Sequence, residues 1–161
     1  MGIEDMGEAD MRQFIEDVGI LYGEMGFPRM AGRVFGWLLV CDPPYQSAEQ
    51  LATIVEASKG SISSMTRLLI QMGMVERIGI PGRRDTYYRI RSGSWSELMK
   101  NHLANLTALR KLAERGLDLM ADRAHESRQR LQALRDFHAF LEQEIPSLLD
   151  RYEQGRKEEK W

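Results

Sequence analysis

Apolar residues recur at three- and four-residue intervals in two short stretches near the middle of the chain. The first, residues 48–55, follows Ser47, whose hydroxyl is spaced with Gln50 to form a helix capping box. The second begins at Ser58, another capping residue, and stops at Gly73, which favours the left-handed conformation at a helix end. Two short helices joined by a tight turn are therefore predicted. Their apolar sides are formed by Leu51, Ile54 and Val55 in the first and by Ile62, Met65, Leu68, Leu69 and Met72 in the second.

The opposite side of the second helix is small, polar and basic. A helix can enter the major groove of DNA only where its leading side chains let the backbone approach the bases. This face therefore suits a recognition helix. Its residues are Lys59, Ser61, Ser63, Ser64, Arg67 and Gln71.

Beyond Gly73 the pattern changes to β-branched and aromatic residues on either side of a turn. Pro81-Gly82 marks the turn, and Arg83 and Arg84 lie near its tip. Two helices followed by a basic hairpin form a winged helix-turn-helix. The alternative is a small helical domain with an incidental hairpin. The helix caps, the apolar stripes and the turn residues all favour the winged helix instead. The strand residues are Met74, Val75, Ile78 and Ile80 before the turn and Thr86, Tyr87, Tyr88 and Ile90 after it.

Three runs resemble the GbsR branch of the MarR-type transcriptional regulators. They are GFPRMAGRVFGWLL from Gly26, ASKGSIS from Ala57, and PGRR from Pro81 together with Tyr87 and Tyr88. The resemblance covers roughly residues 10–152, and the second run is its most specific part. It implies a homodimeric DNA-binding regulator, often one that a small molecule releases from its operator. We accordingly expect a sequence-specific regulator, a repressor in particular.

Helices are predicted on both sides of the winged helix. Apolar residues at helical spacing run through residues 8–25, and Pro28 starts a second helix that reaches Val40, with Gly32 and Gly36 one turn apart. After the hairpin, residues 95–155 carry a long stripe at three-four spacing, which Arg110 and Ser127 interrupt. The stripe consists mainly of Met99, Leu103, Leu106, Ala113, Leu117, Met120, Leu131, Leu134, His138, Leu141, Ile145, Leu148 and Tyr152.

The expected fold is mainly α with a small β-hairpin, a winged helix-turn-helix plus long dimerisation helices. We predict a turn near residues 122–127 between two antiparallel helices, and a short last helix or a kink at Pro146. The predicted organisation is an N-terminal dimerisation helix over residues 1–25, a DNA-binding domain over 26–93 and a C-terminal helical dimerisation region over 94–161. A homodimer would bury the apolar surface of the flanking helices. An intramolecular hairpin in a monomer is the alternative.

Charge is unevenly distributed although the whole chain carries only −2. Residues 1–24 hold seven acidic side chains against Arg12, a net charge of −6. Residues 57–91 hold seven basic side chains against Glu76 and Asp85, a net charge of +5. Phosphates respond to the local field, which is positive where the winged helix is predicted.

The predicted DNA contacts come from the second helix and the hairpin tip. Arg67 is the long donor on its face and suits a bidentate contact to guanine, or alternatively a phosphate clamp. Asp85 is placed to hold one of the two hairpin arginines. The predicted DNA-binding residues are Ser58, Lys59, Ser61, Ser63, Ser64, Arg67, Arg83 and Arg84.

Enzymatic chemistry is not expected. The three histidines lack a partner at zinc-ligand spacing, Lys59-Gly60-Ser61 lacks the upstream glycine of a phosphate loop, and no cofactor or metal site is predicted.

The lone Cys41 rules out an internal disulfide and follows an apolar run, which indicates a buried thiol. No signal peptide or membrane span is indicated, so we expect a cytoplasmic protein. The alternative function is a winged-helix protein-interaction module, which would not need the basic face.

An effector site is the least specific expectation. The family resemblance implies a pocket where the winged helix meets the long helices. Aromatic side chains could enclose a cationic or aromatic ligand there, and could equally be ordinary core. The candidate residues are Phe14, Tyr22, Phe35, Trp37 and Trp95.

Overall fold

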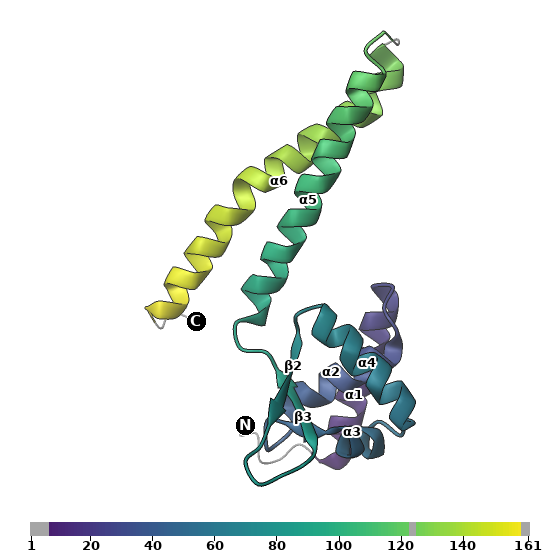
Figure 1. The fold of residues 1–161 in the computed structure, drawn as a ribbon, viewed down its shortest axis with the longest axis vertical. Helices are drawn as coiled ribbons and strands as arrows, with labels where there is room; N and C mark the ends of the chain where they lie inside the picture. The colour runs from purple at the N-terminus through teal and green to yellow at the C-terminus, as the bar shows by residue number, and fades with distance from the viewer. Residues whose placement is uncertain (1–6, 123–124, 159–161) are drawn as a thin grey trace. The chain divides into compact units, whose positions relative to one another are not determined.

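The computed structural model describes residues 7–122 and 125–158, which form two compact units, Met1–Ser94 and Trp95–Trp161. In the first unit α1 (Glu8–Glu24) lies against α2 (Arg29–Val40) (Figure 1). Gly32 makes this packing close, because a β-carbon there would stand 2.6 Å from the carbonyl oxygen of Val18 and 2.8 Å from the α-carbon of Gly19. The backbone of α1 therefore occupies the space that the missing side chain of Gly32 leaves on α2.

The helix-turn-helix consists of α3 (Ala48–Ile54) and α4 (Lys59–Gln71). The predicted capping box is present, since the backbone N–H of Gln50 donates to Ser47 Oγ at 3.2 Å and Ser47 N–H donates to Gln50 Oε1 at 2.8 Å. The α4 cap is confirmed too, with Ser61 N–H donating to Ser58 Oγ at 3.2 Å. Gly73 ends α4 with a φ of +76°.

The predicted hairpin is confirmed as β2 (Val75–Gly79) and β3 (Thr86–Ile90), but the sheet has a third strand. A two-residue strand, β1 (Gln46–Ser47), pairs with the other side of β3, giving the antiparallel order β1-β3-β2. Sequence patterns missed β1 because two residues are too few to show an alternation, and Ser47 already had a role as a helix cap. The pairing places the start of α3 directly beside the wing.

The core of the first unit lies between α1, α2, α3, α4 and the inner side of the sheet. Its fully buried side chains include Leu51, Ile62 and Leu69, as the helical stripes predicted. Cys41 is buried as expected, and its Sγ lies 3.9 Å from the carbonyl oxygen of Leu38. The core also includes Ile15, Tyr22, Ala31, Val34, Phe35, Leu38, Val55, Met74, Val75 and Tyr88.

The second unit is an antiparallel pair formed by α5 (Ser94–Leu119) and α6 (His125–Lys157) (Figure 1). The break between them falls where a turn was predicted; residues 123 and 124, within it, lie outside the described residues. His138 is buried, with its Nδ1 2.7 Å from the carbonyl oxygen of Leu134, which agrees with a packed imidazole. None of the described helices combines the length and apolar composition that a membrane span requires.

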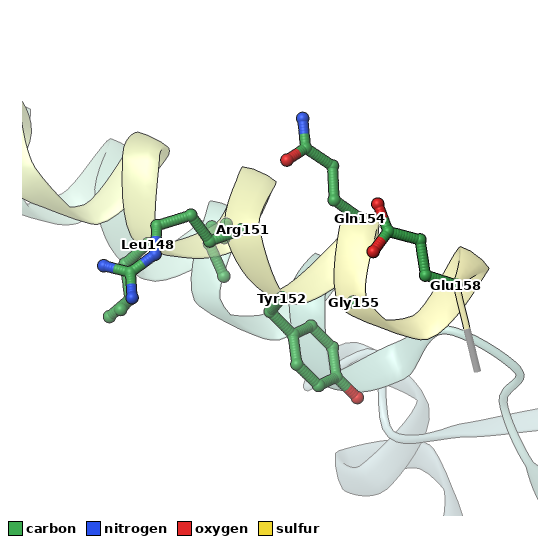
Figure 2. A pocket seen from close by; sticks show the side chains of 7 residues that line it. Leu148, Arg151, Tyr152, Gln154, Gly155 and Glu158 are labelled. Carbon is green, nitrogen blue, oxygen red and sulfur yellow. The ribbon is translucent and has the colours of Figure 1, made fainter. Parts of the chain in front are cut away.

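One detail of the long helices was predicted wrongly. Leu148 is 61% exposed, and instead of facing α5 it lines an open concavity of about 590 Å³ on α6 with Tyr152 and Gly155 (Figure 2). Its neighbours in the predicted stripe, Ile145 and Tyr152, are half-buried, so spacing alone did not show which stripe positions α5 covers. Of the two alternatives predicted at Pro146, a separate last helix does not form, because α6 runs through this residue.

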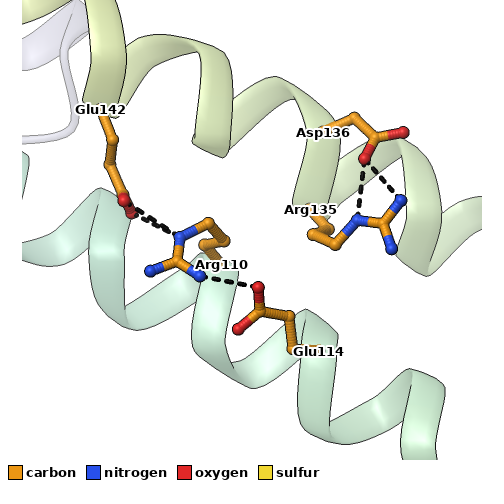
Figure 3. Close-up of polar contacts among 5 residues, drawn as sticks. All are labelled: Arg110, Glu114, Arg135, Asp136 and Glu142. Carbon is orange, nitrogen blue, oxygen red and sulfur yellow. Dashed lines mark hydrogen bonds and ion pairs between the residues drawn. The ribbon is translucent and has the colours of Figure 1, made fainter.

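Arg110 interrupts the apolar stripe because it bridges the two helices. Its Nε lies 3.1 Å and 3.0 Å from the two carboxylate oxygens of Glu142 on α6, and its Nη1 lies 2.7 Å from Glu114 Oε1 (Figure 3). Arg110 and Glu142 are both mostly buried, with side chains 23% and 21% exposed. This three-residue network fixes the register of α5 against α6.

Candidate nucleic-acid interface

The polar face of α4 is exposed as its sequence pattern predicted. Lys59, Ser63, Ser64 and Arg67 are exposed and Ser61 is half-buried. The face lies opposite the buried stripe, and buried Thr66 turns its hydroxyl back to the carbonyl oxygen of Ile62 at 2.8 Å. The small hydroxyl side chains of this face, together with the positively charged Lys59 and Arg67, can approach the base edges of a major groove.

The wing, which consists of β2, β3 and the turn between them, presents Arg83 and Arg84 at an exposed tip. The turn is closed by Arg83 N–H, which donates to the carbonyl oxygen of Ile80 at 3.0 Å, and Gly82 supplies the positive φ of +80°. The tip thus carries two guanidinium groups side by side in the chain.

Arg83 is held by an unexpected partner. Its Nη1 donates to the Tyr87 hydroxyl at 3.1 Å, and its guanidinium carbon lies 6.0 Å from the centroid of the Tyr87 ring. This hydrogen bond is the main cause that raises the pKa of the Arg83 guanidinium. The expected partner, Asp85, makes no hydrogen bond or ion pair with a described residue. Sequence spacing could not reveal the contact, because it depends on how the turn folds back over β3.

A groove of about 380 Å³ separates the polar face of α4 from the wing. Lys59 and Ser63 form one side of it, while Asp85 and Tyr88 belong to the wing side. The remaining lining residues are Ser47, Ala48, Glu49 and Thr86, from β1, α3 and β3. The recognition helix and the wing therefore border one continuous surface in the first unit.

Not every basic residue of this region is available to DNA. Arg89 and Glu76 are directly opposite each other on β3 and β2, and Arg89 Nε lies 2.7 Å from Glu76 Oε1. This cross-strand ion pair cancels one positive charge outside the wing tip. The exposed basic residues of the polar face of α4 and of the wing tip keep their positive charges.

The aromatic residues predicted for an effector site lie in different surroundings. Tyr22 and Phe35 are core residues, with ring centroids 5.5 Å apart, and the Tyr22 hydroxyl donates to Met74 Sδ at 3.3 Å. Phe14 is half-buried in the first unit, while Trp95 is exposed in the second.

Trp37 is the candidate that borders a cavity. The cavity has a volume of about 300 Å³ and a mainly apolar lining. Its walls come from three helices of the first unit. They are Met11, Arg12 and Ile15 on α1, Trp37 on α2 and Ile54 on α3.

Known proteins resemble this chain over nearly its whole length. A sequence profile of MmpR5-like MarR family transcriptional regulators matches residues 93–156. The HTH-type transcriptional regulator MmpR5 of Mycobacterium tuberculosis (strain ATCC 25618 / H37Rv) is 38% identical over 159 residues, which cover 98% of this chain and 96% of that protein. A crystal structure of a transcriptional regulator shares 39% identity and superimposes with a TM-score of 0.80, covering 90% of this chain and 99% of its own. The similarity includes both the winged helix and the long helices.

Proposed function

The chain belongs to the MarR family of transcriptional regulators, and from this premise we propose that it is a homodimeric repressor. Membership of the family makes it a DNA-binding regulator rather than an enzyme or a DNA-free interaction module. In the proposal α4 enters the major groove and the wing contacts the phosphate backbone or the adjacent minor groove. The groove that the polar face of α4 and the wing border together is the observation that carries this assignment.

Within α4, Arg67 is proposed to read a base. It is exposed on the same face as Ser63 and Ser64, whose small side chains let the helix backbone come close to the groove floor. Ser58, Lys59 and Ser61 lie around the N-terminus of α4, where the helix dipole favours phosphate. The proposal therefore divides α4 into a phosphate-binding start and a base-reading middle.

The test is a mobility-shift assay on DNA from upstream of the protein's own gene, with random DNA as competitor. Arg67→Ala should reduce the preference for operator over random DNA by a factor that corresponds to about 1–3 kcal/mol, because a bidentate contact to guanine is lost. Lys59→Ala should instead weaken binding to both DNAs equally. Equal weakening by Arg67→Ala would make Arg67 a phosphate clamp.

The homodimer is supported by apolar residues that the single chain leaves exposed. The α5–α6 hairpin forms within one chain, yet it does not cover Phe137 and Phe140, which are 59% and 58% exposed. A second copy is the simplest cover for such a surface. Other exposed apolar residues include Ile20 and Leu21 on α1, Met25 at its C-cap, Leu109, Leu112 and Leu119 on α5, and Leu148 on α6.

We further propose the cavity beside Trp37 as the place of a small, mainly apolar effector. It lies within the DNA-binding unit, and its wall residue Ile54 belongs to α3, which directly precedes the recognition helix. An occupant could shift α3 and hence α4 relative to DNA. Phe14, Tyr22, Phe35 and Trp95 do not contribute to its lining.

Three finer assignments complete the proposal. Residues 1–25 and 94–161 are assigned to dimerisation and residues 26–93 to DNA binding, although α1 packs on α2 within the first unit. The site of action is the cytoplasm, where a transcriptional regulator meets the chromosome. Placement in the GbsR-like branch stays a prediction from the three sequence runs, since the relatives found bear the MmpR5 name.

A further inference from the structure

The two wing arginines differ in how they are held. Arg83 donates to the Tyr87 hydroxyl at 3.1 Å, with its guanidinium carbon 6.0 Å from the centre of the same ring. Arg84 is also exposed, but makes no hydrogen bond or ion pair within the described parts of the chain. The side chains of these two neighbouring arginines therefore differ in conformational freedom before DNA binds.

Tyr87 is a fixed point within the sheet. It is paired with Ser47 on one side and with Ile78 on the other, in the central strand β3. The ring of Tyr45 meets its ring edge-on, with centroids 5.6 Å apart and an angle of 89° between the planes. The side chain is only 3% exposed, so its hydroxyl cannot follow the movements of the wing tip.

The burial of Tyr87 does not serve the main core. Successive side chains of a strand point to opposite faces, and here Tyr88 belongs to the core cluster while Tyr87 does not. Tyr87 lies instead on the outer face of the sheet, between Tyr45 and Arg83. A hydroxyl at this position contributes little to the core and is in direct contact with a cation at the wing tip.

A phenol is well suited to hold an arginine without weakening it for DNA. A carboxylate such as Asp85 would cancel the guanidinium charge, whereas the hydroxyl oxygen accepts a hydrogen bond and remains neutral. Arginine has five N–H donors, so one bond to Tyr87 leaves most of them for phosphate oxygens. Holding the side chain beforehand also reduces the conformational entropy that binding must remove.

We propose that Tyr87 is a positioning residue for DNA binding, which orients the Arg83 guanidinium toward phosphate through its hydroxyl, with Tyr45 fixing the ring. This inference rests on the proposed function, since it requires the wing to contact DNA. Arg84 makes its own contact from an unrestrained side chain. Tyr87 itself does not touch DNA.

The experiment is a double-mutant cycle on operator affinity. Tyr87→Phe keeps the ring, its burial and its contact with Tyr45, and should weaken binding about three- to tenfold because Arg83 must be ordered on binding. The salt slope should stay the same, since Arg83 still reaches phosphate. Arg83→Ala should flatten that slope by about 0.9, as expected for one lost phosphate contact. Adding Tyr87→Phe to Arg83→Ala should then change nothing.

Arg84→Ala provides the matched control. Because Tyr87 does not hold Arg84, the effects of Tyr87→Phe and Arg84→Ala should multiply in the double variant. If Tyr87→Phe weakens binding as much in the Arg83→Ala background as in the wild type, the hydroxyl acts on DNA or on the fold, and the positioning role is refuted. If neither Arg83→Ala nor Arg84→Ala changes the salt slope, the proposed wing contact itself fails.

A measurement without DNA keeps the inference testable should Tyr87→Phe disturb the wing. In ¹⁵N spectra of the free wild-type protein, rotation of the Arg83 guanidinium should be slower than that of Arg84. Tyr87→Phe should remove this difference. Equally fast rotation of both groups in the wild type would overturn the proposal, whatever the binding assays give.

Discussion

At the residue scale, single hydroxyl groups determine much of the geometry of the winged helix. Ser47 and Ser58 satisfy backbone N–H groups at the starts of α3 and α4, and so fix where the recognition helix begins. Tyr87 holds an arginine at the wing tip. In the core, the Tyr22 hydroxyl links α1 to Met74 just after α4.

Tyr22 should make stability fall at high pH. Burial raises the pKa of its phenol from 10.0 to about 12, so the unfolded chain loses this proton first as the pH rises. The free energy of unfolding therefore keeps the full contribution of Tyr22 below pH 10 and loses it between about pH 10 and 12, on the order of 2 kcal/mol in total. Denaturant unfolding should show that the free energy of unfolding of the wild type falls relative to that of Tyr22→Phe as the pH rises through this range. A difference independent of pH would contradict it.

Local signals in the sequence identified one set of side-chain roles and missed another. The caps at Ser47 and Ser58 follow from spacing alone, because donor and acceptor are three residues apart in the chain. The Arg83–Tyr87 contact does not, since it requires the exact fold of the turn. Tyr22 and Phe35 were candidate ligand walls because their aromatic character is visible in the sequence, while their position in the core is not.

At the element scale, a partly buried ionic network interrupts the apolar stripe of the α5–α6 hairpin. The sequence showed Arg110 only as an interruption, because its partner Glu142 lies on another helix. The same limit applies to β1, whose two residues acquire a strand conformation only through β3. Helix periods, caps and turn residues are local and were predictable; pairing between distant segments was not. The error at Leu148 has the same origin, because the burial of a stripe position depends on the partner helix.

Arg110→Met should destabilise the second unit although it completes the apolar stripe. The carboxylates of Glu142 and Glu114 would remain without their shared partner, and Glu142 is only 21% exposed. Arg135→Met is the matched control, because its ion pair with Asp136 is between chain neighbours and more exposed (Figure 3). Thermal unfolding should show a midpoint several degrees lower for Arg110→Met and nearly unchanged for Arg135→Met. Equal midpoints for the two variants would mean that the network does not hold the register.

At the scale of the whole molecule, one chain provides one recognition helix and more apolar surface than it covers. The N-terminal acidic region and the basic winged helix also have opposite charge, which favours only one side of the molecule for DNA. The uncovered apolar surface supports the proposed assembly of two chains. The length and apolar stripes of the helices predicted a homodimer from the sequence, but they could not show which apolar residues one chain leaves exposed.

Phe140→Glu should dissociate the homodimer without unfolding the chain. The side chain is 58% exposed in the single chain, so a charge there costs little in the monomer and much in an apolar interface. Ala139→Glu places the same charge on the neighbouring exposed position of α6, away from the predicted inner stripe and from the side that carries Phe137 and Phe140. It should leave the dimer intact. Light scattering at micromolar concentration gives the mass, and circular dichroism gives the helix content. A folded wild-type monomer would contradict the dimer directly.

The measurement closest to the central claim is a footprint of the wild-type protein on DNA from upstream of its own gene, combined with the number of chains bound. Two winged helices related by a two-fold axis should protect two half-sites whose centres are separated by about 10–10.5 base pairs or a multiple of this, with two chains per duplex. The wing should add protection in the minor groove beside each half-site. Binding of one chain to a single half-site, or no protected site at all, would contradict a homodimeric regulator that reads DNA through α4 and the wing.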